Sequence, residues 1–126
     1  MGWLEELFGT GKPVIAMVHL GALPGSPGYD AECGIDGLTR GAMADLEALQ
    51  AGGVDAVMVG NENDRPYRLT ATPESLAAMA AIVAALKPAI RVPFGVNDRW
   101  DPVATVALAV ATGAAFAREI FTGVYA

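Results

Sequence analysis

The chain has 126 residues, of which 53% are hydrophobic and 17% are charged, and its net charge is −6 at pH 7. This length and composition predict a single globular domain and exclude a disordered segment, and the acidic balance argues against nucleic acid as a partner. The single cysteine, Cys33, excludes an internal disulfide and a cysteine-based zinc site and favours a reducing, cytoplasmic location.

The first predicted element is a short amphipathic turn over residues 1–11, in which Trp3, Leu4, Leu7 and Phe8 share one side. Acidic residues stand there in place of the basic residues of a secretory signal peptide. Nowhere does an apolar stretch reach the roughly 18 residues that a membrane span requires. We therefore predict a protein without a membrane span.

An unbroken apolar run extends from Val14 to Val18 and is followed by His19. The run is too short for a helix and is typical of a parallel strand that is buried on both faces. The loop over residues 21–28 that comes next is rich in glycine and proline. Because ligands bind at the carboxyl ends of strands in parallel α/β proteins, His19 is the first candidate functional residue.

Helices and strands alternate along the rest of the chain. The patterns predict helices over residues 36–51, from Thr72 to Lys87 and from Asp101 to Gly113, and strands over residues 54–59, 90–96 and 115–121. In the last helix Val103, Val106 and Val110 recur at helical spacing, and we expect them to form its buried stripe.

This (βα)3β order predicts right-handed crossovers and a parallel sheet. Two architectures accommodate it: a small open, doubly wound sheet, or the first half of a (β/α)8 TIM barrel. The loops after the first two strands are long and polar, whereas the connections that lead into the later strands are tight. That asymmetry favours the barrel, whose functional face lies at the carboxyl ends of its strands. We therefore expect residues 1–126 to form a single α/β domain, a half-barrel.

Several motifs resemble those of the BtpA/SgcQ family of TIM barrels, which are related to the ribulose-phosphate-binding barrels. The similar segments are residues 12–20, 23–27 and 52–55, the region of Asn61, Asp64, Pro66 and Tyr67, residues 95–97, and Phe116, Arg118, Thr122, Gly123 and Tyr125. Members of that family are twice as long, so the resemblance implies the first half of a barrel, from a truncated or half-length protein. One departure is Gly60, where that family usually carries a glutamate.

The resemblance implies two unlike roles. One is an enzyme that acts on a small anionic ligand of the sugar or nucleoside kind, such as a nucleosidase. The other is a non-enzymatic, thylakoid-associated factor for photosystem I assembly or stability. Such a factor would use the barrel as a binding scaffold and would contact a membrane only peripherally.

The predicted catalytic residues are His19 and Asp64. His19 is suited to general acid or base chemistry near neutral pH, or it could be held by a carboxylate across the barrel mouth. Asp64 could orient His19, bind a hard cation together with Asn61 and Glu62, or cap the loop before Pro66. No metal site is predicted, and no motif assigns a cofactor.

The predicted substrate-binding residues are Asn61, Asn97, Arg99 and Arg118. Guanidinium groups bind carboxylates and phosphates through paired hydrogen bonds, which suits an anionic ligand. Arg118 could instead form an ion pair with a neighbouring carboxylate, Glu119 or Asp98. No lysine stands at a predicted strand end, so Schiff-base chemistry is not expected here.

Four parallel strands alone would leave the first and last strands as open edges and one sheet face bare. Large exposed apolar surfaces are rare on soluble monomers. We therefore expect either a homo-oligomer that pairs through these strand edges, or a fragment whose complete form supplies the missing half.

Overall fold

The computed structural model describes residues 2–120. The helices are α1 (Trp3–Phe8), α2 (Gly34–Ala51), α3 (Pro73–Leu86) and α4 (Pro102–Thr112), with a 3-10 turn, η1 (Lys87–Ala89), directly after α3. The strands are β1 (Ile15–His19), β2 (Ala56–Gly60), β3 (Phe94–Asn97) and β4 (Phe116–Ala117). The predicted alternation of strands and helices is thereby confirmed.

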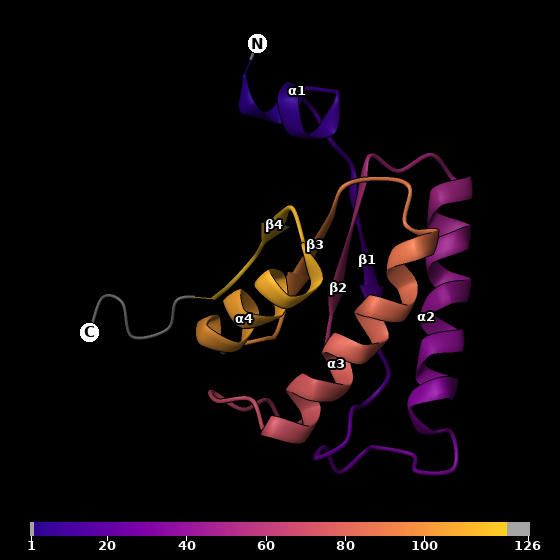
Figure 1. Cartoon of the computed structure of the whole chain (residues 1–126), viewed down its shortest axis with the longest axis vertical. Helices are drawn as coiled ribbons and strands as arrows, with labels where there is room; N and C mark the ends of the chain where they lie inside the picture. Colours follow the sequence, from indigo (N-terminus) through magenta and orange to yellow (C-terminus); the bar gives the residue numbers. More distant parts are fainter. Residues whose placement is uncertain (1, 121–126) are drawn as a thin grey trace.

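The strands form one all-parallel sheet in the order β1-β2-β3-β4. Helices α2, α3 and α4 all cover the same face of this sheet (Figure 1). The core lies between them, where Val18, Val59 and Val96 of the strands pack with Leu46 and Ile82 of the helices. A doubly wound sheet would have helices on both faces, so this α/β fold is that of half a (β/α)8 barrel.

The predicted starts of α3 and α4 are confirmed by their capping hydrogen bonds. The Thr72 hydroxyl accepts from the Ser75 amide at 3.3 Å, and the Asp101 carboxylate accepts from the Ala104 amide at 2.9 Å. In each case a proline follows at the first helical position, where a missing amide hydrogen costs nothing. These caps fix the residues at which the loops after β2 and β3 end and helices α3 and α4 begin.

The third strand is shorter than the predicted range of residues 90–96. Its first part is held by the end of α2 instead: the Gln50 side chain donates to the Ala89 carbonyl at 3.0 Å and accepts from the Arg91 amide at 2.6 Å. The Arg91 amide, which is bonded to Gln50, is not available for a ladder, and Pro93 has no amide hydrogen to donate. The strand begins at Phe94. The fourth strand is also shorter than predicted, and Phe121 of that range lies outside the described residues.

The prediction that Val103, Val106 and Val110 are buried is wrong. All three are exposed, and the buried side of α4 carries Ala104, Thr105, Leu108 and Thr112. Polar contacts at the start of the helix set its rotation: the Thr105 hydroxyl accepts from the Asp98 amide at 2.9 Å and donates to the Glu119 carboxylate, and the Asp101 carboxylate accepts from the Ala71 amide at 2.7 Å. Hydrophobicity alone could not reveal this.

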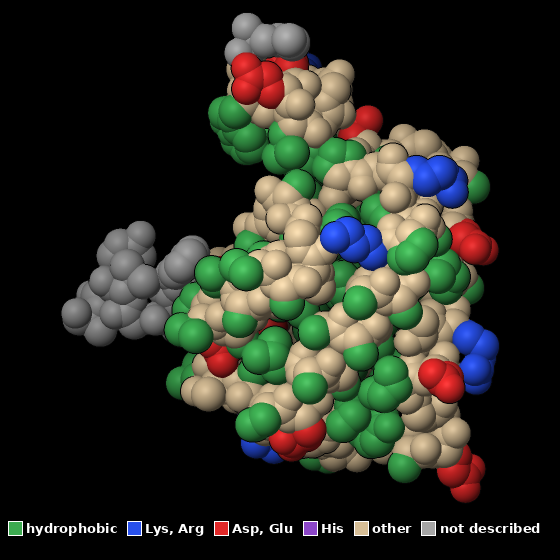
Figure 2. Space-filling model, viewed as in Figure 1, with side chains coloured by type: hydrophobic (Ala, Val, Ile, Leu, Met, Phe, Trp, Pro, Cys, Tyr) green, Lys and Arg blue, Asp and Glu red, His purple; other side chains and the backbone are tan. Residues whose placement is uncertain are grey.

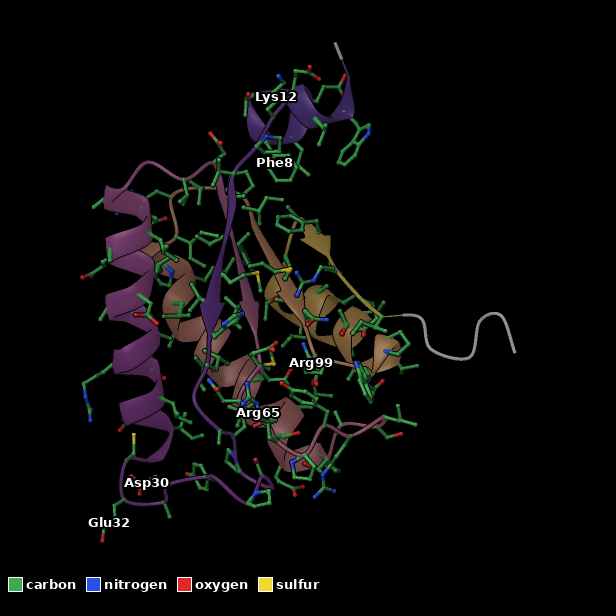
Figure 3. The ribbon with its side chains drawn as sticks, turned by 180° about the vertical axis from the view of Figure 1, so that it is seen from behind. Phe8, Lys12, Asp30, Glu32, Arg65 and Arg99 are labelled. Atoms are coloured by element: carbon green, nitrogen blue, oxygen red, sulfur yellow. The ribbon has the colours of Figure 1, made fainter. Side chains whose placement is uncertain are left out.

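The other face of the sheet carries no helix among the described residues (Figure 3). Only α1 approaches it, at the amino ends of the strands, where Phe8 meets Phe116 edge to face with ring centroids 5.5 Å apart. In the described part of the chain, no helix is both long and apolar enough to cross a membrane.

Candidate functional site

Three polar side chains stand in one line across the carboxyl edge of the sheet. His19 is paired in register with Gly60, and Gly60 with Asn97. The Arg118 amide donates to the Val96 carbonyl at 3.3 Å, which continues the last ladder by one residue and puts Arg118 opposite Asn97. We call His19, Asn97 and Arg118 the sheet row.

The sheet row lies on the face without helices. Val18, Val59 and Val96 immediately precede His19, Gly60 and Asn97, and all three valines belong to the core under the helices. Since successive side chains in a strand point to opposite faces, the row points the other way, toward what would be the interior of a complete barrel.

Two members of the sheet row have no partner among residues 2–120. The His19 and Arg118 side chains are exposed, and neither forms a hydrogen bond or ion pair within that range. The expected contacts of His19 with Asp64 and of Arg118 with Glu119 or Asp98 are therefore not among them. Asn97 is buried and donates to the Arg118 carbonyl at 2.7 Å. The row thus offers an imidazole and a guanidinium to a ligand.

A second polar group, which we call the loop lock, consists of Asn61, Asp64 and Asp98. The Asn61 amide group donates to Asp64 Oδ2 at 3.1 Å and to Asp98 Oδ1 at 2.9 Å, while its Oδ1 accepts from the Arg99 amide at 3.0 Å. Asp64 Oδ1 accepts from the Leu23 amide at 2.7 Å. The lock therefore ties together the loops that follow β1, β2 and β3.

Arg99 is engaged on two sides. It forms an ion pair with Glu62 at 2.7 Å, and its guanidinium carbon lies 4.0 Å from the centre of the Tyr67 ring. The Tyr67 hydroxyl accepts from Arg65 Nε at 3.2 Å. Figure 3 shows both arginines at the carboxyl end of the sheet. Because Glu62 and Tyr67 already satisfy the Arg99 charge, this arginine orders the loops rather than presenting a free cation.

Asp98 has a raised pKa. Burial raises its pKa from 3.8 to about 6, and the negative charges of Asp101, Asp64 and Glu119 act in the same direction, against the hydrogen bond from Asn61. The residue is 4% exposed, and its Oδ2 has no hydrogen-bond partner among the described residues. Asp98 therefore takes up a proton at mildly acidic pH.

A cavity of about 30 Å³ adjoins the loop lock. Its lining residues are Gly25, Ser26, Asn61, Asp64, Pro66, Tyr67, Arg68, Ala71, Thr72, Ser75, Asp98 and Arg99. This volume suits a water molecule and is too small for a sugar ring.

The structure separates the six predicted site residues into two sets. His19, Asn97 and Arg118 form the sheet row, whereas Asn61 and Asp64 belong to the lock and Arg99 donates to it through its backbone. Glu62 pairs with Arg99 instead of joining Asp64 at a cation. Residues 2–120 contain no cluster of three or more His, Cys, Asp or Glu side chains that could hold a metal ion.

The sequence places Asp98 among the polar residues at the strand ends, with no role beyond a possible ion pair with Arg118, and it assigns no role to Tyr67. Asn97 and Asp98 are adjacent polar residues at a strand end, and only the register shows that Asn97 points to the open face while Asp98 joins the lock. Tyr67 follows a proline in a long loop, and nothing in its spacing predicts that it packs on Arg99.

The chain is similar to known proteins along its whole length. The model of the BtpA family matches residues 10–126. SgcQ, a protein of the sgc region of Escherichia coli, is 58% identical over 126 residues, which are 100% of this chain and 47% of SgcQ. The photosystem I biogenesis protein BtpA of Synechocystis is 36% identical over 98% of this chain and 43% of BtpA.

Archaeal proteins match as well. An uncharacterised protein of Pyrococcus horikoshii is 37% identical over 90% of this chain and 44% of its own length. The chain spans about half the length of the curated relatives that it matches. No solved structure matches it.

Proposed function

Because the chain belongs to the BtpA family, we propose that its sheet row is half of the ligand site of a barrel enzyme. The ligand class is a small anionic molecule of the sugar or nucleoside kind. His19 serves as the general acid or base, and Arg118 binds the anionic group. Asn97 lies between them and holds the backbone at Arg118 in place.

The observation that carries this proposal is the alignment of His19 and Arg118 on the open face, with no partner for either among residues 2–120. Gly60 lies between His19 and Asn97 and contributes no side chain, so a gap separates them. Two strand spacings put the backbones at His19 and Asn97 roughly 10 Å apart. Arg118 stands one strand further on, beyond Asn97, so a ligand that extends past Asn97 meets an imidazole at one end and a guanidinium at the other, which can move a proton and hold an anion.

The loop lock plays a positioning part in this proposal. Asn61 and Asp64 fix the loops after β1 and β2, and Arg99 is held by Glu62 and Tyr67. A rim whose loops are tied to one another keeps reacting groups in place, which lowers the entropic cost of reaching the transition state.

Thermal unfolding in the presence of sugar phosphates and nucleosides tests the proposal. The 126-residue chain is measured alone and in an equimolar mixture with the part of SgcQ that it does not match. A ligand that binds only the folded state raises Tm, and a concentration of about 100 times Kd adds about 2.7 kcal/mol of stability. We expect at least one compound to raise Tm in the mixture.

The variants His19→Ala and Arg118→Ala should lose that increase in Tm. Arg40→Ala supplies a matched control, since Arg40 is an exposed arginine on α2 far from the row in the chain. If no compound raises Tm in either sample, or if the row variants keep the full increase, the proposal is wrong.

A second candidate function is that of a binding scaffold in complex assembly. It is favoured by the similarity to the photosystem I biogenesis protein BtpA, which covers 98% of this chain. It is also favoured by the outer surface of α3 and α4, which carries no charge apart from Glu74 in the first turn of α3 and offers apolar contacts to another protein.

A chimera separates the two candidates. This chain replaces the matching half of BtpA in Synechocystis, and the photosystem I content of the cells is measured. Under the scaffold function, His19→Ala and Arg118→Ala leave that content unchanged, whereas charged substitutions on α4 lower it. Under the enzyme function, His19→Ala and Arg118→Ala lower the photosystem I content.

A further inference from the structure

Helix α1 carries an apolar stripe that the described residues leave largely uncovered. Its members share one side of the helix: Trp3, Leu4, Leu7 and Phe8. None of the four is buried, and Trp3 is 69% exposed. A helix of six residues is too short to be stable in water by itself, so packing against another surface has to hold it. We call these four residues the α1 stripe.

The α1 stripe is anchored at the far edge of the sheet. Helix α1 directly precedes β1, the first strand, yet its Phe8 packs edge to face on Phe116 of β4, the last strand. Three strand spacings put these two edges roughly 14 Å apart along the sheet. Figure 3 shows Phe8 pointing from α1 toward the sheet. Helix α1 therefore reaches across the amino ends of the strands, from one sheet edge to the other.

Phe116 lies on the open face, the face that α2, α3 and α4 do not cover. It is paired in register with Gly95, whose neighbours Phe94 and Val96 belong to the core under the helices. A β carbon at Gly95 would collide with the Phe116 ring, so the ring lies directly over the backbone of Gly95. Phe8 in turn packs on that ring. Helix α1 is thus held at the amino end of the face that lines the interior of a barrel.

The two sides of α1 differ in polarity. Glu5 and Glu6 lie opposite the α1 stripe at 3.6 residues per turn. Figure 2 shows hydrophobic side chains gathered on the lower side of α1, next to the hollow beneath it, and acidic side chains on its upper side. An amphipathic helix places its polar side in water and its apolar side on protein. The stripe therefore faces the position of a protein partner.

The open face identifies that partner. All-parallel sheets occur almost only where both faces are covered, and in an eight-stranded barrel the inner faces of the two halves cover each other. The chain spans 47% of SgcQ and 43% of BtpA, so these relatives contain a further stretch of at least the same length. Four more parallel strands would pair with the free edges of β1 and β4, and their amino ends would lie at the same mouth as α1.

We propose that α1 caps the amino end of the complete barrel and that the α1 stripe binds the second half of that barrel. The partner is a unit of four parallel strands with their helices. It meets the stripe with apolar side chains at the amino ends of its strands, while the contact of Phe8 with Phe116 holds the cap in place. This inference goes beyond the proposed ligand site, since it concerns the opposite end of the sheet.

A chimera tests the proposal, in which this chain is joined in one polypeptide to the part of SgcQ that it does not match. Trp3→Asp is introduced into the chimera and into the 126-residue chain, because an acidic residue suits the first turn of a helix. In the 126-residue chain, where Trp3 is exposed, Tm should change by less than about 2 °C. In the chimera Tm should fall by at least about 5 °C, because a buried tryptophan is lost.

Val103→Asp is the matched control. Val103 is also an exposed apolar residue in the first turn of a helix, but α4 lies on the other face of the sheet. This variant should leave the Tm of both proteins within about 2 °C. Hydrogen exchange gives a second readout that needs no substitution. The amides of residues 3–9 should exchange at least about tenfold more slowly in the chimera than in the 126-residue chain.

Four outcomes would overturn the proposal. One is a chimera whose Tm is no higher than that of the 126-residue chain, because the second half then does not dock. The second is an equal loss of Tm for Trp3→Asp and Val103→Asp in the chimera, and the third is an equal loss for Trp3→Asp in both proteins. The fourth is equally fast exchange of residues 3–9 in both proteins. None of these readouts involves a ligand, so the proposal can fail while the proposed ligand site stands.

Discussion

The two polar groups at the carboxyl edge of the sheet use their hydrogen-bonding capacity in opposite ways. In the loop lock, Asn61 bonds Asp64, Asp98 and the Arg99 amide, so each member has at least one partner within the protein, although Asp98 Oδ2 has none among residues 2–120. In the sheet row, His19 and Arg118 have none among residues 2–120. Polar groups that are satisfied internally contribute to stability, whereas free ones at a strand end are available to a ligand.

Because of this difference, mutations should affect stability and ligand binding separately, although the two properties are often lost together. Substitutions in the lock should change stability, because they leave buried donors or acceptors unpaired. Substitutions of His19 and Arg118 should change ligand binding and leave stability alone, because these two side chains are exposed and form no hydrogen bond among residues 2–120. The following predictions test that separation, from the largest expected effect to the smallest.

Asn61→Ala should have the largest effect. It removes the donor to two carboxylates and the acceptor for the Arg99 amide, in a region where Asn61 and Asp98 are both buried. Uncompensated buried groups of this kind cost about 3 kcal/mol in unfolding free energy. Urea unfolding followed by circular dichroism measures the loss.

The neighbouring Asn63→Ala is the matched control for this prediction. Asn63 donates one hydrogen bond, to the Leu20 carbonyl at 2.7 Å. Its loss should cost about 1 kcal/mol. Equal losses for the two variants would mean that Asn61 is not the centre of the lock.

The raised pKa of Asp98 predicts that stability increases as pH falls. In the unfolded chain its pKa is 3.8, and in the folded protein it is about 6. Between these values the folded state binds more protons than the unfolded state, so the unfolding free energy rises as pH is lowered through about 6 toward 4. The shift corresponds to a gain of at most about 3 kcal/mol.

Asp98→Asn should remove this dependence, because the amide neither ionises nor carries a buried charge. The measurement is the urea midpoint at several pH values between 4 and 8, for both proteins. At each pH, the difference between the urea midpoints of the unmodified chain and the variant isolates the contribution of Asp98 from those of the other carboxyl groups. Parallel pH profiles would contradict the assignment of the shift to Asp98.

The sequence predicted the order of the elements and the side on which the candidate residues meet. His19 and the residues after β2 and β3 lie at one edge because the strands are parallel, and helical caps such as Thr72 and Asp101 have local signatures. These features depend on short-range chemistry or on topology, which a single sequence expresses directly.

Rotation and pairing could not be predicted in the same way. Val103, Val106 and Val110 satisfy the helical period of a buried stripe, yet contacts of Asp101 and Thr105 turn them outward. The contact of Asp101 with Ala71 joins residues far apart in the chain, as that of Asn61 with Asp98 also does. The hydrophobic period identifies an apolar face and does not state whether the core or another molecule covers it.

Substitution of the helix-capping residues should have an intermediate effect on the unfolding free energy. Asp101→Ala should cost about 2 kcal/mol, because the carboxylate serves both the Ala104 and Ala71 amides and is buried. Thr72→Ala should cost about 1 kcal/mol, since its hydroxyl serves the Ser75 amide alone. Urea unfolding of the two variants, compared at pH 7, measures the difference. An equal loss of unfolding free energy for the two variants would show that the hydrogen bond from the Ala71 amide to Asp101 does not join the loop before α3 to the loop before α4.

The smallest effect on stability should come from the sheet row. His19→Ala and Arg118→Ala should each change the unfolding free energy by less than about 0.5 kcal/mol, since both side chains are exposed and form no hydrogen bond among residues 2–120. A loss as large as that of Asn61→Ala would mean that the row is part of the lock. A small loss of stability together with a full loss of ligand-induced stabilisation would instead place the chemistry on the open face of the sheet, with the lock as its support.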